Sequence, residues 1–199
     1  KTAGDDPAVY DRMVDRCLTR VNFMRKMIAD LLDLTRIESG QKKRELAQVD
    51  LVDAVNTAID TALPEAQDRK ITIELHNDGP KSLLGDISEL EIMMNNLVSN
   101  AVKYNSEGGR VDIALAETPT QIIVSVADTG IGMTPEESAR LFQDFMRIKN
   151  EKTKDILGSG LGLSTVKKLA QMYGGDITVS SEPGVGSTFT ATLMKDCPA

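Results

Sequence analysis

The sequence predicts an α+β fold, in which a mixed β-sheet carries helices on one face and a long helix precedes the domain. Strand and helix patterns are mixed along the chain, without the regular repetition of a βαβ fold. The chain has 199 residues, 41% of them hydrophobic, so it can bury the core of one ordinary domain. Its first part carries a heptad pattern instead, which sets that part apart from the domain.

The segment from Pro7 to Gly40 is expected to form one helix. Apolar residues recur along it at alternating intervals of four and three, forming an unbroken seam: Tyr10, Val14, Cys17, Val21, Met24, Ile28 and Leu31. Further apolar residues widen the stripe on both flanks, as in a bundle of several helices. We expect this helix to pair with another helix or another chain; packing on its own domain is the alternative.

The chain up to residue 104 is predicted to add three short strands and two helices. Strands are expected at 45–51, 71–76 and 82–86, and helices at 51–68 and 87–104. Asp50 and Asp86 precede the helices as N-caps, and Glu89 completes a capping-box pattern with Asp86. His76 ends a strand, where we interpret it as an ordinary surface residue.

The rest of the chain is predicted to contain four strands and two helices. Strands are expected at 109–118, 121–128, 176–181 and 187–194, and helices at 135–142 and 161–173. The last two strands form a hairpin. A polar, charged stretch at 147–160 separates the two helices, and its length and glycines are typical of an active-site lid.

Composition excludes several functional classes. The net charge of -7 argues against a general binder of nucleic acid or anionic membranes. A single histidine argues against multi-histidine metal sites and a Ser-His-Asp hydrolase. Cys17 and Cys197 are too far apart for a CxxC site, and we expect a reducing, intracellular setting. No apolar run reaches the roughly 18 residues of a membrane span, so we expect this piece to be soluble.

Two glycine-rich segments could bind a nucleotide. In ADTGIGM, Asp128 ends an apolar strand, and its carboxylate could accept a hydrogen bond from an adenine amino group. Gly130 and Gly132 follow it and would let the backbone approach a flat base. The second segment, GSGLGL, enters a helix, where unpaired N–H groups can cradle phosphate. A simple turn and a flexible hinge are the respective alternatives.

Polar residues on the helix at 87–104 form a third candidate group. Asn96 and Asn100 are four residues apart and therefore share a face. Their amide oxygens suit Mg²⁺, and Lys103 beside them suits phosphate. Polar helix surface is the alternative interpretation. The stretch 147–160 offers more positive charge through Arg147, Lys149, Lys152 and Lys154, although a solvated loop would look the same.

Taken in order, these segments resemble the ATP-binding catalytic domain of bacterial sensor histidine kinases. NNLVSNAVKY resembles the N box, ADTGIGM the first glycine box, LFQDFMRI the phenylalanine box, GSGLGLSTVKKLAQMYGG the second glycine box and GVGSTF the third. NFMRKMIADLLDLTRIESGQ resembles the second helix of the family's dimerization domain. The resemblance implies a two-layer α/β sandwich of the Bergerat type. It also implies a partial dimerization domain at 1–42 and a catalytic domain at 43–199.

The resemblance also implies roles for individual residues. On the phosphate side it implies catalytic roles for Asn96, Lys103 and Arg147, with Asn100 as the Mg²⁺ ligand. On the adenine side it implies contacts from Tyr104, Asp128, Gly130, Gly132 and Thr188. In the lid and its hinge it implies roles for Phe142, Phe145, Gly158, Gly160, Leu161, Gly162 and Leu163.

One departure from the family concerns the phosphate acceptor. Family members carry an H box, in which the acceptor histidine precedes an acidic residue, on the first dimerization helix. The only histidine here, His76, stands in IELHND and lacks that context. We expect the acceptor to lie upstream of this piece; a protein that never had one is the alternative.

The resulting expectation is the catalytic portion of a histidine kinase that uses ATP and Mg²⁺. It would transfer the γ-phosphoryl group to a histidine and onward to an aspartate of a response regulator receiver domain. The parent would be a homodimer through the helical bundle, cytoplasmic or anchored in the inner membrane, and would bind no nucleic acid. A serine kinase or ATPase with the same boxes and a non-catalytic docking module are the competing hypotheses.

Overall fold

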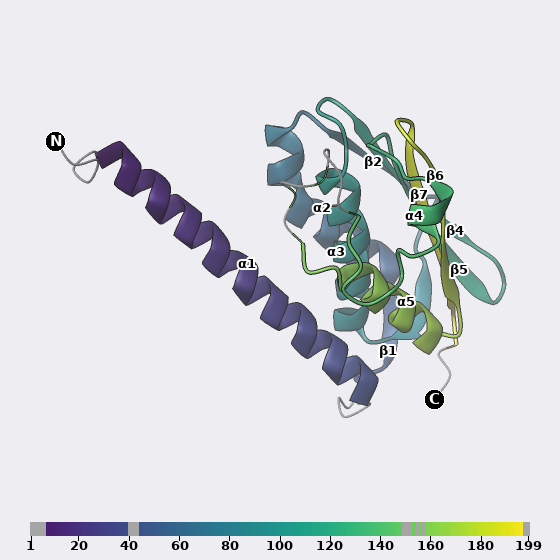
Figure 1. Ribbon diagram of the computed structural model, residues 1–199. Helices are drawn as coiled ribbons and strands as arrows, with labels where there is room; N and C mark the ends of the chain where they lie inside the picture. The colour runs from purple at the N-terminus through teal and green to yellow at the C-terminus, as the bar shows by residue number, and fades with distance from the viewer. Residues whose placement is uncertain (1–6, 40–43, 149–152, 154–155, 157, 197–199) are drawn as a thin grey trace.

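The computed structural model describes residues 7–39, 44–148, 153, 156 and 158–196 (Figure 1). Its elements are α1 (Pro7–Ser39), β1 (Ala47–Asp50), α2 (Leu51–Asp68), β2 (Thr72–His76), β3 (Ser82–Gly85), α3 (Ile87–Lys103), β4 (Arg110–Glu117), β5 (Gln121–Asp128), α4 (Pro135–Ser138), α5 (Gly162–Met172), β6 (Asp176–Glu182) and β7 (Gly186–Met194). These bounds agree with the predicted elements to within a few residues, except at α4.

The domain is a two-layer sandwich of a sheet and helices. Five strands form the sheet in the order β2-β4-β5-β7-β6; β2 pairs parallel with β4, and the other pairs are antiparallel. The long helices α2, α3 and α5 lie on one side of this sheet (Figure 1). β1 and β3 form a separate two-stranded antiparallel sheet. The predicted α+β class and mixed sheet are therefore confirmed.

The core lies between the helices and the inner face of the sheet. Side chains alternate along β4, so that Val111 and Ile113 are fully buried while Asp112 and Ala114 point the other way. The apolar stripe of α3 supplies the opposite wall, with Met94 and Leu97 inaccessible to solvent. The polar outer face of the sheet is left to solvent.

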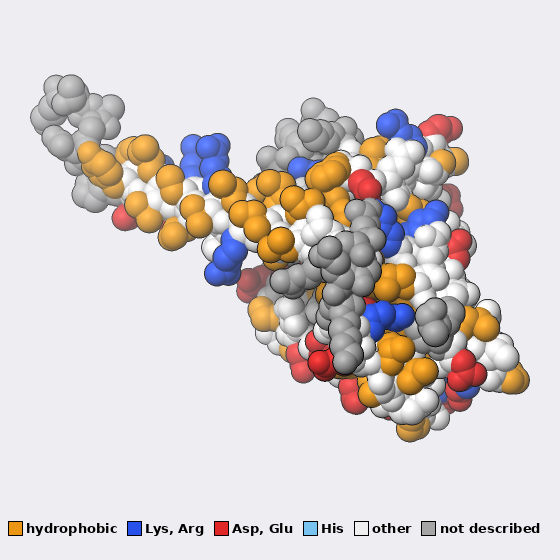
Figure 2. Space-filling view, turned by 90° about the horizontal axis from the view of Figure 1, so that it is seen from below, with side chains coloured by type: hydrophobic (Ala, Val, Ile, Leu, Met, Phe, Trp, Pro, Cys, Tyr) orange, Lys and Arg blue, Asp and Glu red, His pale blue; other side chains and the backbone are white. Residues whose placement is uncertain are grey.

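α1 projects from the domain as a single straight helix (Figure 1). Hydrophobic side chains follow its length on the surface shown in Figure 2. The seam residues on it are 44–59% exposed: Tyr10, Val14, Val21, Met24, Ile28 and Leu31. Near the domain, Leu34 is buried, and α1 contacts α5. Within the described part of the chain, no helix has the length and apolar character that crossing a membrane requires.

Arg44, which follows α1, binds the domain through a buried ionic cluster. Its guanidinium group donates three hydrogen bonds of 2.9–3.1 Å to Glu89 and lies 4.9 Å above the ring of Tyr173. The Tyr173 hydroxyl donates to the same carboxylate at 2.8 Å and accepts from the Asp86 N–H at 2.9 Å. Residues from three distant parts of the chain therefore anchor the segment after α1 to the rest of the fold.

Two local predictions need correction. Asp86 caps α3 through the Ser88 N–H, but Glu89 does not close a capping box, because its carboxylate is held by Arg44 and Tyr173. The helix expected at 135–142 ends at Ser138. Beyond it, Arg140 and Leu141 donate to carbonyls only three residues back, so the chain continues as tight turns.

Candidate functional site

A cavity opens between α3, the ends of β5 and β7, and the segment that leads into α5. Its lining comes from five regions of the chain: Asp30, Asn96, Ser99, Asn100, Lys103, Tyr104, Asp128, Ile131, Gly132, Met133, Leu141, Met146, Arg147, Ile148, Thr153, Gly158, Ser159, Gly160, Gly162, Leu163, Ser187 and Phe189. Part of this lining is apolar and part polar, which is typical of a small-molecule site with a few orienting groups.

α3 supplies the polar wall of the cavity. Its apolar stripe is buried in the core, so Asn96, Asn100 and Lys103 emerge on the opposite face. The Asn96 amide donates to the Ile92 carbonyl at 2.8 Å, which leaves its own oxygen directed at the backbone of Gly162. Tyr104 is the C-cap residue of α3. Burial raises the pKa of its hydroxyl, so this side chain lines the cavity in its neutral form.

Asp128 is the acidic group of the cavity. It ends β5 and accepts a hydrogen bond of 2.8 Å from the Gly130 N–H. Burial raises the pKa of its carboxyl to about 6, against the lowering effect of backbone N–H groups of Gly130 and Ser187. A half-desolvated carboxylate of this kind gains most from a further hydrogen-bond donor, which a ligand can bring.

The glycines beside Asp128 and in the lid are needed sterically. Gly132 has φ +60°, and a Cβ there would overlap the Glu182 carbonyl. A Cβ on Gly130 would overlap the Tyr104 carbonyl. Gly160 has φ +77° and packs closely on the backbone of Phe145. The glycine boxes therefore let backbone segments meet around the cavity.

The start of α5 faces the cavity. Among the described residues, no side chain caps this helix at Leu161, and Gly162 and Leu163 in its first turn line the cavity. The first N–H groups of a helix attract anions. Asn96 lies against Gly162, and Gly158 lies near Lys103 and Tyr104, so this anion-attracting end adjoins the polar wall of α3.

The lid segment contributes Arg147, whose guanidinium donates to the Ile156 carbonyl at 2.5 Å. Thr153 donates to the Ile148 carbonyl at 2.7 Å and is buried. Lys149, Lys152 and Lys154, the other cations predicted for this segment, lie outside the described residues.

Five predicted residues stand apart from the lining. Gly130 supports the site through its N–H bond to Asp128. Phe145 is 61% exposed, and Leu161 is fully buried in the core. Thr188 pairs with Ala127 and Ser180 on the sheet, one residue beyond the lining Ser187. Phe142, predicted to anchor the lid, packs on the core beneath Lys167.

The cavity also has walls that sequence reasoning missed. The most unexpected is Asp30 of α1, whose carboxylate accepts a hydrogen bond of 2.6 Å from the Ser159 hydroxyl in the lid. None of the nucleotide-binding motifs contains Asp30; it lies on a flank of the heptad seam, where an acidic residue looks like solvated surface. The cavity also has apolar walls from Ile131, Met133 and Phe189. These residues belong to the quoted motifs, but their side chains alone did not indicate a role in binding.

Comparisons with known proteins point to one family. The family model described as histidine kinase-, DNA gyrase B-, and HSP90-like ATPase matches residues 85–196. The sensor-like histidine kinase SenX3 of Mycobacterium tuberculosis is 35% identical over 193 residues, which cover 96% of this chain and 47% of SenX3. The chain thus spans about half the length of the curated relatives it matches.

Solved structures agree in fold. Full-length ShkA in complex with AMPPNP matches with a TM-score of 0.77 and 27% identity, over 94% of this chain and 40% of ShkA. Histidine kinase ThkA in complex with the response regulator protein TrrA matches with a TM-score of 0.74 over 98% of this chain and 54% of that chain. The identity to ThkA is 20%, so that likeness concerns the fold alone.

Proposed function

This chain belongs to the histidine kinase-, DNA gyrase B- and HSP90-like ATPase family, and we propose that it is the ATP-binding catalytic portion of a sensor histidine kinase. The observation that carries the proposal is the joint lining of one cavity by Asp128, the α3 amides and the open start of α5. An adenine amino group needs a carboxylate acceptor, and a triphosphate needs N–H donors and cations.

Asp128 is proposed to select adenine. Its carboxylate accepts from the exocyclic amino group, whereas guanine would present a carbonyl oxygen to the same carboxylate. Gly132 and the apolar side chains of Ile131 and Met133 line the cavity beside it and form a surface for a flat base. Tyr104, with its neutral hydroxyl, extends this surface toward Lys103.

The polar wall of α3 has the donor chemistry that Mg²⁺ requires. Asn100 and Asn96 both line the cavity and carry amide oxygens, and hard oxygen donors in small number suit this ion. We propose that Asn100 holds Mg²⁺ and that Asn96 supports the same site. The ion would neutralise charge on the phosphate oxygens.

Lys103, Arg147 and the start of α5 are proposed to position the triphosphate. Lys103 and the N–H groups of Gly162 and Leu163 bind phosphate oxygens. Arg147 exchanges its present bond to the Ile156 carbonyl for the γ-phosphate. Catalysis then comes from positioning and charge neutralisation rather than from covalent chemistry of the protein.

Titration calorimetry with Mg·ATP, with GTP as the control nucleotide, tests this site. Asn100→Ala should weaken Mg·ATP binding much more than Mg-free ATP binding, and Asp128→Asn should weaken both. Since the folded pKa of Asp128, about 6, exceeds the ordinary 3.8, keeping this carboxylate ionised at pH 7 costs folding free energy. Asp128→Asn should therefore raise the melting temperature of the empty protein. Unchanged affinity in both variants would disprove the site.

The kinase activity of the whole protein extends this proposal. We propose that residues 1–42 are part of the dimerization domain, whose exposed seam pairs in a homodimeric bundle, and that 43–199 form the catalytic domain. The phosphoryl group passes to a histidine on a first dimerization helix and then to a receiver-domain aspartate of a response regulator, in the cytoplasm. ThkA is one relative in fold that has been solved with a response regulator.

Labelled phosphoryl transfer tests the proposed reaction. With γ-labelled ATP, this chain alone should acquire no acid-labile, base-stable label, because His76 lies on the outer face of β2, away from the cavity. A separately supplied dimerization domain carrying the acceptor histidine should acquire it. Phosphoserine on either partner would instead favour a serine kinase.

A further inference from the structure

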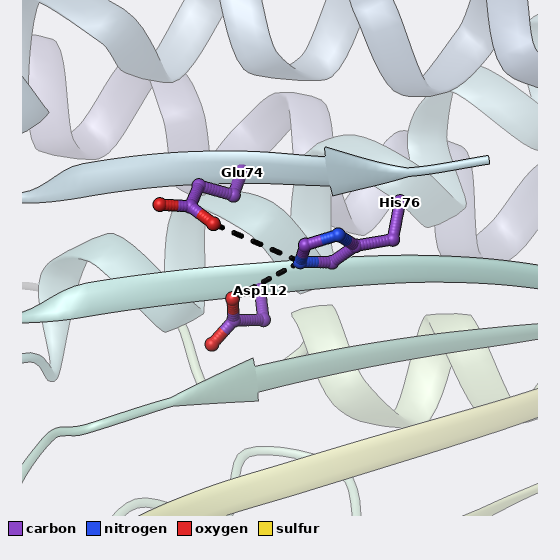
Figure 3. A group of neighbouring side chains, drawn as sticks. All are labelled: Glu74, His76 and Asp112. Carbon is purple, nitrogen blue, oxygen red and sulfur yellow. Dashed lines mark hydrogen bonds and ion pairs between the residues drawn. The ribbon is translucent and has the colours of Figure 1, made fainter.

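We propose that Glu74, His76 and Asp112 form a site for a divalent cation of the Zn²⁺ type, on the sheet face opposite the helices. The three side chains project from β2 and β4 toward one another (Figure 3). Nothing in the nucleotide site uses them, and they lie outside the cavity lining.

The parallel pairing of β2 and β4 creates this cluster. Glu74 and Asp112 are direct partners in the register, and His76 lies two residues farther along β2 on the same face. The neighbouring residues Leu75 and Ile113 turn inward to the core, so the alternation fixes all three side chains on the outer face. The backbone supports the site rigidly, because both strands are hydrogen-bonded in the sheet.

The distances fit a bound ion. The three potential ligand atoms all lie within 4.8 Å of one another. The His76 Nε2 atom is 3.2 Å from the Asp112 Oδ1 atom and 3.9 Å from the Glu74 Oε2 atom. Nitrogen and oxygen ligands about 2.1 Å from a tetrahedral Zn²⁺ are about 3.4 Å apart. Small side-chain rotations would therefore complete the ligand shell.

The ligand types select the class of cation. An imidazole nitrogen favours Zn²⁺, Ni²⁺ or Cu²⁺ over Mg²⁺ and Ca²⁺, which prefer oxygen. Two carboxylates balance the double charge of the ion, and the exposure of His76 and Glu74 leaves room for a water as fourth ligand. The ion would tie β2, which is an edge strand, to β4.

Arg110 offers an internal test of the charge argument. Its Nε atom donates to the Asp112 Oδ2 atom at 2.8 Å, which turns the other carboxylate oxygen toward His76. The same guanidinium also places a positive charge beside the site and opposes cation binding. Removing this charge should strengthen binding, whereas removing a ligand should weaken it.

The solitary histidine makes the site directly observable. In tag-free protein, the imidazole signals in an NMR spectrum come from His76 alone. The protein should carry Cys17→Ser and Cys197→Ser, so that no thiol competes, and be stripped of metal. Zinc chloride is then added, with magnesium chloride as the control. We expect Zn²⁺ to shift the His76 signals with saturation at one equivalent, and Mg²⁺ to leave them in place.

Variants separate a metal site from a plain ion-pair cluster. Calorimetry should show Zn²⁺ affinity falling roughly tenfold or more in His76→Gln, Glu74→Gln and Asp112→Asn, as for loss of a group that supports the metal. Arg110→Gln should bind more tightly, and Asp176→Asn, an exposed acid on β6, should match the parent. A Zn²⁺ affinity of His76→Gln equal to that of the parent would overturn the proposal, as would His76 signals that do not shift when Zn²⁺ is added.

The same experiment distinguishes this site from the nucleotide site. Mg·ATP affinity should be the same in His76→Gln and the parent, because the cluster lies across the sheet from the cavity. Loss of ATP binding with intact Zn²⁺ binding would count against the proposed function alone. A Zn²⁺ affinity that falls in Asn100→Ala but not in His76→Gln would place the ion in the cavity and refute the new site.

Discussion

α1 and α3 carry similar amphipathic patterns, yet the apolar stripe of α3 is buried and that of α1 is exposed. On α3 the apolar stripe is inaccessible to solvent, with Met93, Met94 and Leu97 all at 0% exposure. On α1 the seam residues remain about half exposed, as Val21 and Ile28 illustrate at 59% and 56%. The pattern therefore predicts a helix that needs a partner, but it does not say whether the partner lies within the same domain.

The difference has an energetic meaning. Burial of the α3 stripe is part of what folds the domain, because apolar area removed from water is the main favourable term. The α1 seam contributes little of this kind in the single chain, and its stabilisation would come from a second surface. Substitutions on the two helices should therefore affect different measurements.

The largest effect should come from a matched pair of leucine truncations. Leu97→Ala on α3 should lower the free energy of unfolding by about 3 to 5 kcal/mol, because it leaves a cavity in the core. Leu18→Ala on α1, where the side chain is 55% exposed, should change it by less than about 0.5 kcal/mol. Urea unfolding monitored by circular dichroism at low protein concentration measures both.

The Leu18 variant also has a second readout. Leu18 lies on a flank of the apolar seam. If the seam pairs between chains, sedimentation at high concentration should show weaker self-association of Leu18→Ala than of the parent. Equal unfolding penalties for Leu18→Ala and Leu97→Ala would mean that α1 packs on its own domain, and the contrast between the helices would be wrong.

A smaller effect is expected at the junction between the two regions. Arg44→Met removes the cation from Glu89, whose side chain is 4% exposed, and should destabilise the domain by about 2 kcal/mol. Lys70→Met breaks the exposed pair with Glu107 and should cost less than about 0.5 kcal/mol. Thermal unfolding compares the two, and similar losses would show that the Arg44 pair behaves as ordinary surface charge.

The same junction shows where sequence reasoning stops. The strand and helix positions followed from local periodicity, and Asp50 and Asp86 were correctly identified as caps. The predicted capping box at Glu89 was wrong because Arg44 binds that carboxylate instead. Arg44 lies 45 residues away in the sequence, so no local pattern shows this contact. The predicted end of α4 was wrong because no local sequence signal identifies Ser138 as its last residue. Long-range partners leave no periodic signal.

The residues of the candidate site likewise fall into those that the sequence predicted and those that it did not. Asp128, Asn100 and Lys103 could be found because each stands in a recognisable motif, and the cavity brings them together. Asp30 could not be found, because its position depends on how α1 meets the lid. The exposure of Phe145 and the burial of Leu161 likewise depend on packing that a motif does not encode.

The smallest predicted effect concerns Asp30, the one point where α1 reaches the cavity lining among the described residues. Its carboxylate adds negative charge beside the proposed triphosphate site. Asp30→Asn should therefore tighten ATP binding about threefold, corresponding to under 1 kcal/mol for a solvent-screened charge, and should tighten ADP binding less. Asp33→Asn, one turn along α1 and outside the lining, is the matched control for calorimetry.

Ser159→Ala distinguishes the two ways in which Asp30 could act. If its charge opposes the phosphates, Ser159→Ala leaves that charge in place and should not reproduce the gain. If the 2.6 Å hydrogen bond instead holds the lid against α1, both variants should tighten ATP binding equally. Weaker binding of ATP and ADP in Asp30→Asn would contradict both, and would make α1 a supporting wall of the nucleotide site. α1 and the domain would then both contribute to nucleotide binding through Asp30.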